Sequence, residues 1–306
     1  MTKYIIKRVG MMLATLLAIT VLTFTIMHAV PGGPFTSDRE LPPAVEQQLN
    51  AKFNLDLPLP AQYFDYIQGL LLEQDFGPSF KYQGMSVNTF IEEGFPVSAR
   101  LGLVTIVFVL LAAIPLGIVA ALTNGRWQDA LTMGVATLGV TIPSFVVATV
   151  LMYVFSYQLG WLPATGLNTP ASFILPVIAL GGYSLSFVAR LTRSSLLEVM
   201  GQDYIRTARA KGLSEWKVVV RHALRNALIP VITILGTTIA NLLTGSFVVE
   251  KIFAIPGLGV HFVDSITNRD YTAIMGVTIF YATFLVVMIF VVDLFYVLID
   301  PRIKYQ

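Results

Sequence analysis

Apolar residues gather into six long runs along the chain, and most polar residues lie in the segments between them. A helix needs about 20 predominantly apolar residues to cross the hydrocarbon core of a bilayer. Each run is close to that length or longer, so the pattern predicts an all-α polytopic membrane protein with six transmembrane helices. The predicted spans are residues 9–30, 101–123, 130–157, 173–191, 228–249 and 273–299.

The first run raises the question of a cleaved signal peptide. Lys3, Lys7 and Arg8 form a basic start, which a signal peptide and an uncleaved anchor share. The run exceeds the ~7–15 apolar residues of a signal sequence, and a Pro-Gly-Gly-Pro segment follows it in place of a small-residue cleavage site. We therefore expect residues 1–30 to hold the N-terminal end and an uncleaved first span, with a cleaved signal as the alternative.

Two of the polar connections carry amphipathic patterns of their own. In the long connection 31–100, the stretches 43–53 and 60–72 each open with a proline, a favoured first residue of a helix. This connection is predicted to fold as a cap at the outer membrane surface. The connection 250–272 contains Ile-Pro-Gly-Leu-Gly at 255–259 and then Phe262, Val263 and Ile266, which predict a turn and a short helix at the surface.

Basic residues are distributed unevenly between alternate connections. Lys and Arg accumulate on the cytoplasmic side of membrane proteins. With a cytoplasmic N-terminus, 14 of the 20 Lys and Arg residues lie inside, and the outer segments hold Arg39, Lys52, Lys81, Arg100, Lys251 and Arg269. We therefore expect both termini to lie in the cytoplasm. The cap, residues 31–100, would lie outside, and residues 101–306 would form a core of five spans.

The composition agrees with a membrane protein and removes several kinds of site. Of the 306 residues, 12% are charged, against about 25% in a typical soluble domain. The chain has no cysteine, and its three histidines lack metal-ligand spacing, so we expect no metal and no cofactor. No Gly-Lys dipeptide occurs, which excludes a G-x-x-x-x-G-K-[ST] phosphate loop; the chain is not expected to be an enzyme.

The connection 192–227 has the most informative local pattern. It contains seven basic and three acidic residues, no proline and two glycines. Asp203 is a typical N-cap residue, and Lys211 followed by Gly212 is a typical helix end, so residues 204–211 predict a helix of about two turns. A helix this short is not stable alone, so it must dock against something.

The composition of this short helix favours docking onto another protein. Ala208 and Ala210 are small enough to permit a close approach, and Arg206, Arg209 and Lys211 are placed to pair with an acidic groove. The alternative is an ordinary inside loop whose charges face water and anionic lipid headgroups.

The run Arg206-Thr-Ala-Arg-Ala-Lys-Gly212 resembles the coupling motif of ABC importer permeases, in which Glu-Ala-Ala, three residues and a glycine follow one another. Ala208 and Gly212 match, whereas Arg206 and Thr207 replace Glu and the first Ala. The departures are similar to the peptide-transporter branch, whose loop looks like the runs at 204–213 and 221–230. The segments 252–259, 268–271 and 300–302 agree, and 77–82 most resembles the B-type permease subunit of oligopeptide importers.

The resemblance implies a type I ABC importer permease fold and a particular division of labour. A second permease subunit would complete the pathway, two cytoplasmic ATPase subunits would drive it, and a periplasmic binding protein would deliver oligopeptides at the bacterial inner membrane. The coupling helix near 203–213 would transmit nucleotide state to the pathway. Its residues would be Arg206, Thr207, Ala208, Arg209, Ala210, Lys211 and Gly212.

Polar residues within the spans are candidates for the pathway. Thr233, Thr237, Asn241 and Thr244 fall on one helical face and suit a wall that tolerates a peptide backbone. Hydrogen bonding between helices is the alternative use of such residues. A second stripe, Thr137, Thr141 and Ser144 beside Pro143, favours the helix-bonding use, and Ala113, Gly117 and Ala121 favour a packing face.

Asp293 is an acidic residue well inside a predicted span. A charge at the membrane centre costs about 2.5–3.5 kcal/mol on insertion scales. One interpretation is a proton or substrate site; the favoured one is a paired or protonated carboxyl, with Arg190 or Arg193 as partner.

Other cargoes and another class of protein remain as alternatives. The same architecture serves dipeptides, nickel chelates or glycan-linked peptides. A proton-coupled secondary transporter is the remote alternative, because such proteins often show inverted repeats, and none is found here. Nucleic acid is not an expected partner.

Overall fold

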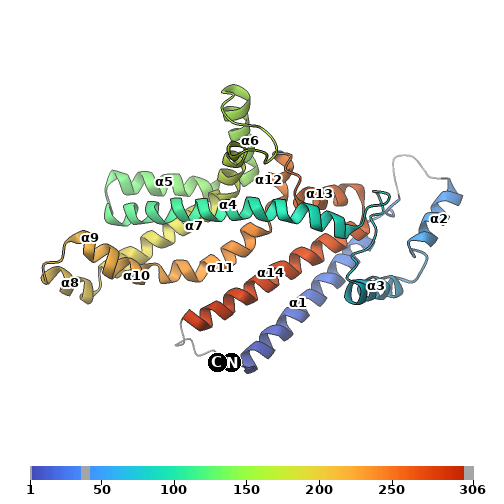
Figure 1. Ribbon diagram of the computed structural model, residues 1–306, viewed down its shortest axis with the longest axis horizontal. Helices are drawn as coiled ribbons and strands as arrows, with labels where there is room; N and C mark the ends of the chain where they lie inside the picture. The colour runs from blue at the N-terminus through green and yellow to red at the C-terminus, as the bar shows by residue number, and fades with distance from the viewer. Residues whose placement is uncertain (1, 36–41, 300–306) are drawn as a thin grey trace. The chain divides into compact units, whose positions relative to one another are not determined.

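The computed structural model describes residues 2–35 and 42–299, which form helices and no strand apart from one isolated bridge between Pro78 and Ser86 (Figure 1). These residues divide into two compact units. Unit 1 contains residues 2–98 and 256–290, and unit 2 contains residues 99–255 and 291–299. The helices are α1 (Thr2–Ala29), α2 (Pro43–Lys52), α3 (Leu59–Gln68), α4 (Val87–Leu122), α5 (Trp127–Thr141), α6 (Ser144–Leu151), α7 (Ile174–Met200), α8 (Asp203–Ala210), α9 (Glu215–Lys217), α10 (Leu224–Ala227), α11 (Ile229–Leu243), α12 (Phe247–Ile252), α13 (Leu258–Asn268) and α14 (Tyr271–Ile299).

Among the described residues, five segments are long and apolar enough to cross a membrane. Helix α5 and the segment Ser144–Gln158, bent by 107° relative to each other, make a sixth if the pair is counted as one span. Six spans were predicted, but a continuous helix over 130–157 was wrong. Proline lacks an amide hydrogen and pushes the preceding residue toward extended backbone. Ile142, which precedes Pro143, accordingly has φ −92° and ψ 124°, and α5 ends there.

Several predicted boundaries also change. Helix α4 begins at Val87, so the last part of the connection predicted over 31–100 is helix. Helix α7 continues to Met200, beyond the predicted end at 191. Helix α11 ends at Leu243, and the predicted span 228–249 is completed by α12 after a short break. At α4 and α7 the difference arises because the helix extends past the apolar run into polar turns.

The predicted cap helices are confirmed. Helix α2 starts at Pro43, and Pro60 lies in the first turn of α3, where a missing amide hydrogen costs nothing. The predicted turn and short helix after residue 255 are also present, as α13. His261 on α13 is half-buried and stacks on Phe90 with ring centroids 4.7 Å apart; burial lowers the pKa of its imidazole.

Within unit 1, α1 and α14 lie side by side (Figure 1). Met27 of α1 is buried against Tyr271, Met275 and Ile279 of α14. The connection after α1 is held by the same end of α14, since the Tyr271 hydroxyl donates to the Gly32 carbonyl at 3.3 Å. The C-terminal end of α1 and the connection after it are therefore packed against the start of α14 and do not form a loose linker.

Asp270, immediately before α14, is a fully buried anchor of unit 1. Its carboxylate accepts hydrogen bonds from the Ser79 hydroxyl and from the backbone amides of Phe80 and Ala273, at 3.1 and 3.2 Å for the amides. Because a buried carboxylate is costly without partners, these donors fix the segment 79–80 against the start of α14.

Within unit 2, α7 is the central helix. Helices α4 and α5 approach it at Gly117 and Gly139, where a Cβ atom would lie 2.6 Å from the Ala189 carbonyl oxygen and 2.3 Å from the Ser186 hydroxyl oxygen. Small residues permit such close backbone contacts between helices in membranes. The predicted packing face is confirmed, since Ala113 and Ala121 on α4 are buried as well.

Candidate functional site

The short helix predicted in the connection 192–227 is α8, and it is bounded almost as expected. Gln202 rather than Asp203 is the N-cap residue, and Asp203 lies in the first turn, where a carboxylate favours the helix dipole. Lys211 is the C-cap, and Gly212 follows with φ +77°. Glycine adopts this left-handed conformation without the strain that a Cβ atom brings.

One face of α8 is embedded in its own chain. Ile205 is 0% exposed and Ala208 is 6% exposed. They belong to a buried cluster completed by Ala121, Leu196, Val218, Ala223 and Ala227. The helix therefore docks onto the ends of α4 and α7 and onto the segment 218–227. The expectation that Ala208 receives another protein was wrong, because its small side chain is used for packing within this chain.

The opposite face of α8 is exposed. Arg206, Thr207, Ala210 and Lys211 all face away from the buried cluster. Arg209 is exposed too, but its guanidinium already forms an ion pair with the Glu215 carboxylate, in which Nε donates to Oε1 at 2.8 Å. This pair closes the turn between α8 and α9. Arg206, Ala210 and Lys211 remain as exposed side chains that do not take part in it.

The return segment after α8 packs closely under it. Residues 218–223 form a π-helical turn that leads into α10, and Val218, Val219 and Ala223 are buried. The Asn226 side-chain amide donates to the Tyr204 hydroxyl at 2.8 Å. Figure 1 shows α8, α9 and α10 together beyond the C-terminal end of α7. The whole connection is thus a compact body continuous with α7 and α11.

An ion pair at the base of this body was not foreseen from the sequence. Arg193 of α7 donates to both carboxylate oxygens of Asp129 on α5, at 2.6 and 2.7 Å, and to the Asn124 side chain at 2.8 Å. The Asp129 carboxylate also accepts from the Gly125 amide. Arg193 therefore joins the α4–α5 turn to α7, and the suggested pairing of Arg193 with Asp293 is replaced by this one. Asp293 itself is half-buried on α14.

The predicted polar face of α11 is exposed on unit 2. Thr233, Thr237 and Asn241 are exposed, whereas Thr244 is half-buried and lies at the C-cap, past the end of the helix. The hydroxyls of Thr233 and Thr237 donate to carbonyls of their own helix, at 2.9 and 3.0 Å from Ile229 and Ile234. Within residues 2–35 and 42–299, these two threonines bond to their own helix and not to another one, and their exposed face is open to a partner, a pathway or lipid.

The stripe on the third span behaves in the same way. The Thr137 and Thr141 hydroxyls donate to their own helix at Met133 and Thr137, at 2.7 and 2.9 Å, and both side chains are exposed. In the part of the chain that the structure describes, these two threonines therefore bond to their own helix and not to another one. Ser144 lies at the bend and lines a hollow of about 590 Å³ with residues of α4, α5 and α7.

The helical architecture as a whole is the class of fold found in ABC importer permeases. Two solved structures are similar to this chain. The methionine ABC transporter MetNI in an inward-facing form has a TM-score of 0.59 and 16% identity, and the match covers 69% of this chain and 97% of that chain. An amino acid ABC transporter has a TM-score of 0.54 and 17% identity, and the match covers 68% of this chain and 93% of that chain.

Comparison with known families gives the particular assignment. The family described as binding-protein-dependent transport system inner membrane component matches residues 113–305, and its N-terminal companion matches residues 1–102. This chain belongs to that family of inner membrane components.

Similar proteins include the dipeptide transport system permease protein DppB of Bacillus subtilis (strain 168), 51% identical over 99% of this chain and 98% of that protein. The oligopeptide transport system permease proteins OppB of Haemophilus influenzae and Escherichia coli K12 are 44% and 41% identical, with full coverage of both chains.

Proposed function

We propose that this chain is one of two permease subunits of a peptide importer in the bacterial inner membrane. It forms the pathway with a second permease subunit, receives short peptides from a periplasmic binding protein, and is driven by two cytoplasmic ATPase subunits. Full-length similarity to permeases of both dipeptide and oligopeptide systems supports peptides as the cargo class. The coupling of the chain to its ATPases takes place at α8.

The observation that carries this proposal is the two-faced burial of α8. Ile205 and Ala208 lock the helix into the buried cluster, while Arg206, Ala210 and Lys211 remain exposed on the other side. A helix fixed on one face and open on the other transmits a push from a docked subunit to the elements that it packs on. Those elements are α4, α7 and the segment leading into α11.

The experiment that tests the proposal purifies the tagged chain with its subunits and measures ATP hydrolysis with and without peptide-loaded binding protein. In Ala210→Trp, the indole on the exposed face of α8 should abolish peptide-stimulated hydrolysis, because the partner surface no longer fits. The matched control is Ala61→Trp, which places the same side chain on an exposed position of another short helix, α3. Full stimulation in Ala210→Trp, or a chain that purifies without ATPase subunits, contradicts the proposal.

The cargo length is tested in the same assay. A dipeptide and a hexapeptide are compared for stimulation at equal saturation of the binding protein. We expect the hexapeptide to stimulate, as for an oligopeptide system. Stimulation by the dipeptide alone favours the dipeptide alternative, to which the 51% identical relative points.

We further propose that the exposed face of α11 lines the pathway. Its threonine hydroxyls bond to their own backbone, which leaves a polar face that costs little to solvate. The double variant Thr233→Val, Thr237→Val should lower peptide uptake severalfold at equal abundance. The control is Thr15→Val, Thr25→Val, two exposed threonines of α1 with the same type of hydrogen bond. Equal effects of both pairs would argue against a pathway role.

A further inference from the structure

Helix α3 of the cap packs along the side of α1 rather than beyond its end. The Tyr63 hydroxyl of α3 lies 2.7 Å from the Thr20 hydroxyl of α1, and the rings of Tyr63 and Phe24 meet edge to face with centroids 5.4 Å apart. The Thr20 hydroxyl donates to the Leu17 carbonyl, so Tyr63 donates the hydrogen between the two hydroxyls. Both hydroxyls of this contact are therefore satisfied without water.

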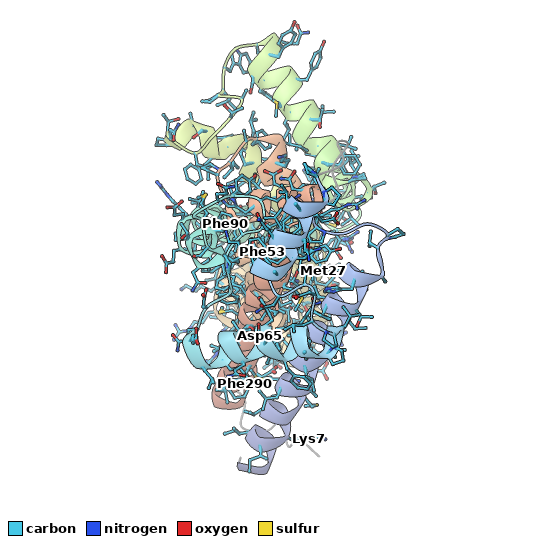
Figure 2. The ribbon with its side chains drawn as sticks, turned by 90° about the vertical axis from the view of Figure 1, so that its right-hand side faces the viewer. Lys7, Met27, Phe53, Asp65, Phe90 and Phe290 are labelled. Carbon is cyan, nitrogen blue, oxygen red and sulfur yellow. The ribbon has the colours of Figure 1, made fainter. Side chains whose placement is uncertain are left out.

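The contact at Thr20 lies well inside the apolar part of α1. The apolar segment Ile5–Ala29 has 25 residues, which at a rise of about 1.5 Å per residue span about 37 Å, against about 30 Å for the hydrocarbon core of a bilayer. Thr20 precedes the end of this segment by about 13 Å. In Figure 2, Asp65 on α3 lies at a level between those of Met27 and Lys7 on α1. Helix α3 therefore lies beside the span, at the depth of the outermost hydrocarbon.

A second membrane-spanning segment indicates the same depth. Tyr66 and Leu70 pack against a buried cluster that includes Met27 of α1 and Ile279 of α14. Ile279 lies about 12 Å beyond the start of the apolar segment of α14. The cluster that holds α3 is thus formed by side chains of two spans and not by a polar loop.

Three large apolar side chains lie exposed along one edge of this segment. Phe64 of α3 is 69% exposed, and Leu71 and Leu72 in the π-helical turn that follows, Gly69–Glu73, are 72% and 74% exposed. Phe64 and Leu71 are separated by about two helical turns, which places them on the same side. We call these three side chains the apolar edge. Adjoining exposed apolar groups of this size mark a contact with another molecule or with lipid.

A polar edge runs beside the apolar edge. It consists of Asp65 and Gln68, which are exposed and share a side of α3. The Asp65 carboxylate accepts from the Asn54 side-chain amide at 3.2 Å, and the Gln62 side-chain amide donates to the Leu55 carbonyl at 3.0 Å. These bonds hold the connection before α3 on its polar side. A helix with separate apolar and polar edges has the pattern of helices that lie in a membrane interface.

The depth and the two edges together favour lipid as the cover of the apolar edge. A bilayer changes from hydrocarbon to hydrated headgroups over a short distance, and interfacial helices bury their apolar side about 5–10 Å into this boundary. Helix α3 changes from apolar to polar between neighbouring edges at that level. The neighbouring span agrees, since only 6% of the most apolar part of α1 is buried within the described residues.

We propose that α3 and the turn Gly69–Glu73 form an interfacial helix, embedded in the leaflet that surrounds the C-terminal half of α1. The apolar edge contacts the acyl chains, and the polar edge faces headgroups and water. The occupant of the apolar edge is the bilayer; a protein subunit and water are outcomes that the test distinguishes. The inference does not rest on peptide transport, because it requires only that α1 and α14 cross a membrane.

Spin-label accessibility tests the proposal, because the chain contains no cysteine and one can be introduced at a time. Phe64→Cys and Leu71→Cys place a nitroxide on the apolar edge, and Gln68→Cys places one on the polar edge. Gln47→Cys, at an exposed position of α2, is the reference for water. The chain is labelled together with its co-purifying subunits in phospholipid nanodiscs. The same complex with the unaltered chain gives the background from other subunits.

Two relaxing agents are compared at each label. Molecular oxygen concentrates in hydrocarbon, whereas the nickel complex of ethylenediaminediacetate stays in water. The ratio of oxygen to nickel collisions should be severalfold higher at positions 64 and 71 than at positions 68 and 47. Nickel collisions at 64 and 71 as frequent as at 47 would show a cap in water and overturn the proposal. Immobile labels that meet neither agent would show a protein subunit over the apolar edge, which also overturns it.

A pair of polar substitutions measures the same contact by stability. Phe64→Gln with Leu71→Gln should lower the thermal midpoint in nanodiscs by several degrees, because amides placed in hydrocarbon lack hydrogen-bond partners. The matched control is Val45→Gln with Leu57→Gln, two exposed apolar residues of the cap outside the apolar edge, which should leave the midpoint unchanged. Equal midpoints for the two pairs overturn the proposal, since side chains already in water lose nothing by becoming polar.

Discussion

Gly212 ends α8 in a backbone conformation that residues with a Cβ atom adopt only with strain. Its φ is +77°, and a Cβ atom there would meet no neighbouring atom within 4 Å. The requirement for glycine is therefore conformational and not steric. The Gly212 amide donates to the Arg209 carbonyl at 2.9 Å, so this conformation also sets the direction in which the chain leaves α8.

Replacing Gly212 by alanine should lower peptide-stimulated ATP hydrolysis. The left-handed conformation costs roughly 1–2 kcal/mol for alanine, which corresponds to about a fivefold or greater loss in the population of the correct turn. The control is Gly84→Ala, which has the same φ of +77° and equally open surroundings, but lies in the cap. Both variants should lose similar stability, and Gly212→Ala alone should lose stimulation. Unchanged stimulation would show that the turn after α8 is not part of coupling.

At Gly212 the backbone conformation requires the residue type, whereas at Asp270 the contacts of the side chain require it. Asp270→Asn replaces one acceptor oxygen by a donor group that faces the existing donors. We expect a loss of about 2–3 kcal/mol in unfolding free energy, because buried hydrogen bonds to a charged group are involved. The thermal midpoint of the purified protein measures it, and the exposed Asp56→Asn should leave it unchanged. A midpoint equal to that of the parent would mean that Asp270 does not anchor the cap.

At the scale of the element, unit 2 is assembled through close approaches between helices. Gly102 of α4 faces α11, where a Cβ atom would lie 2.3 Å from the Leu242 carbonyl oxygen. Gly236 of α11 faces the Val292 side chain of α14. At Gly102 the neighbouring atoms belong to the backbone of α11, which cannot yield as a flexible side chain does, so α4 and α11 are expected to move together. The proposed coupling requires this rigidity, because a displacement of α8 has to reach α11.

A methyl group at Gly102 should therefore separate α4 from α11. Gly102→Ala is expected to reduce the amount of folded protein in the membrane. Overpacking should lower its free energy of unfolding by about 1–3 kcal/mol. Gly134→Ala on α5 is the matched control, since a Cβ atom there meets nothing within 4 Å. It should be neutral or slightly stabilising, because alanine favours helix over glycine. Similar thermal midpoints for the two variants would contradict the close approach.

At the scale of the whole molecule, the distribution of Lys and Arg predicts the orientation in the membrane, with both termini in the cytoplasm. Because the chain contains no cysteine, single cysteines report exposure without further engineering. Ala210→Cys on α8 should react with a membrane-impermeant maleimide only after the inner face is opened. Gln83→Cys in the cap, which is also exposed, should react in intact spheroplasts. The reverse pattern would invert the proposed topology.

Much of the fold could be predicted from the sequence because the length and apolarity of a segment identify a membrane helix. The six spans, the two proline-started cap helices, α8 with its terminal glycine and the small-residue packing face were predicted from local patterns. The bend in the third span was missed, although Pro143 was the signal that could have revealed it. The coupling motif was recognised by resemblance, and the family was confirmed by the comparisons.

The sequence by itself determined which segments are helices, how many can cross a membrane, and which short helix has the properties of a docking element. Only the tertiary structure decided which face of α8 is free, that Arg193 pairs with Asp129, and that Asp270 anchors the cap. The reason is physical. Hydropathy and capping act between residues near each other in the chain, whereas Arg193 and Asp129 are 64 residues apart and Asp270 and Ser79 are 191 apart. Those partners are chosen by how helices pack, and packing depends on the whole chain at once.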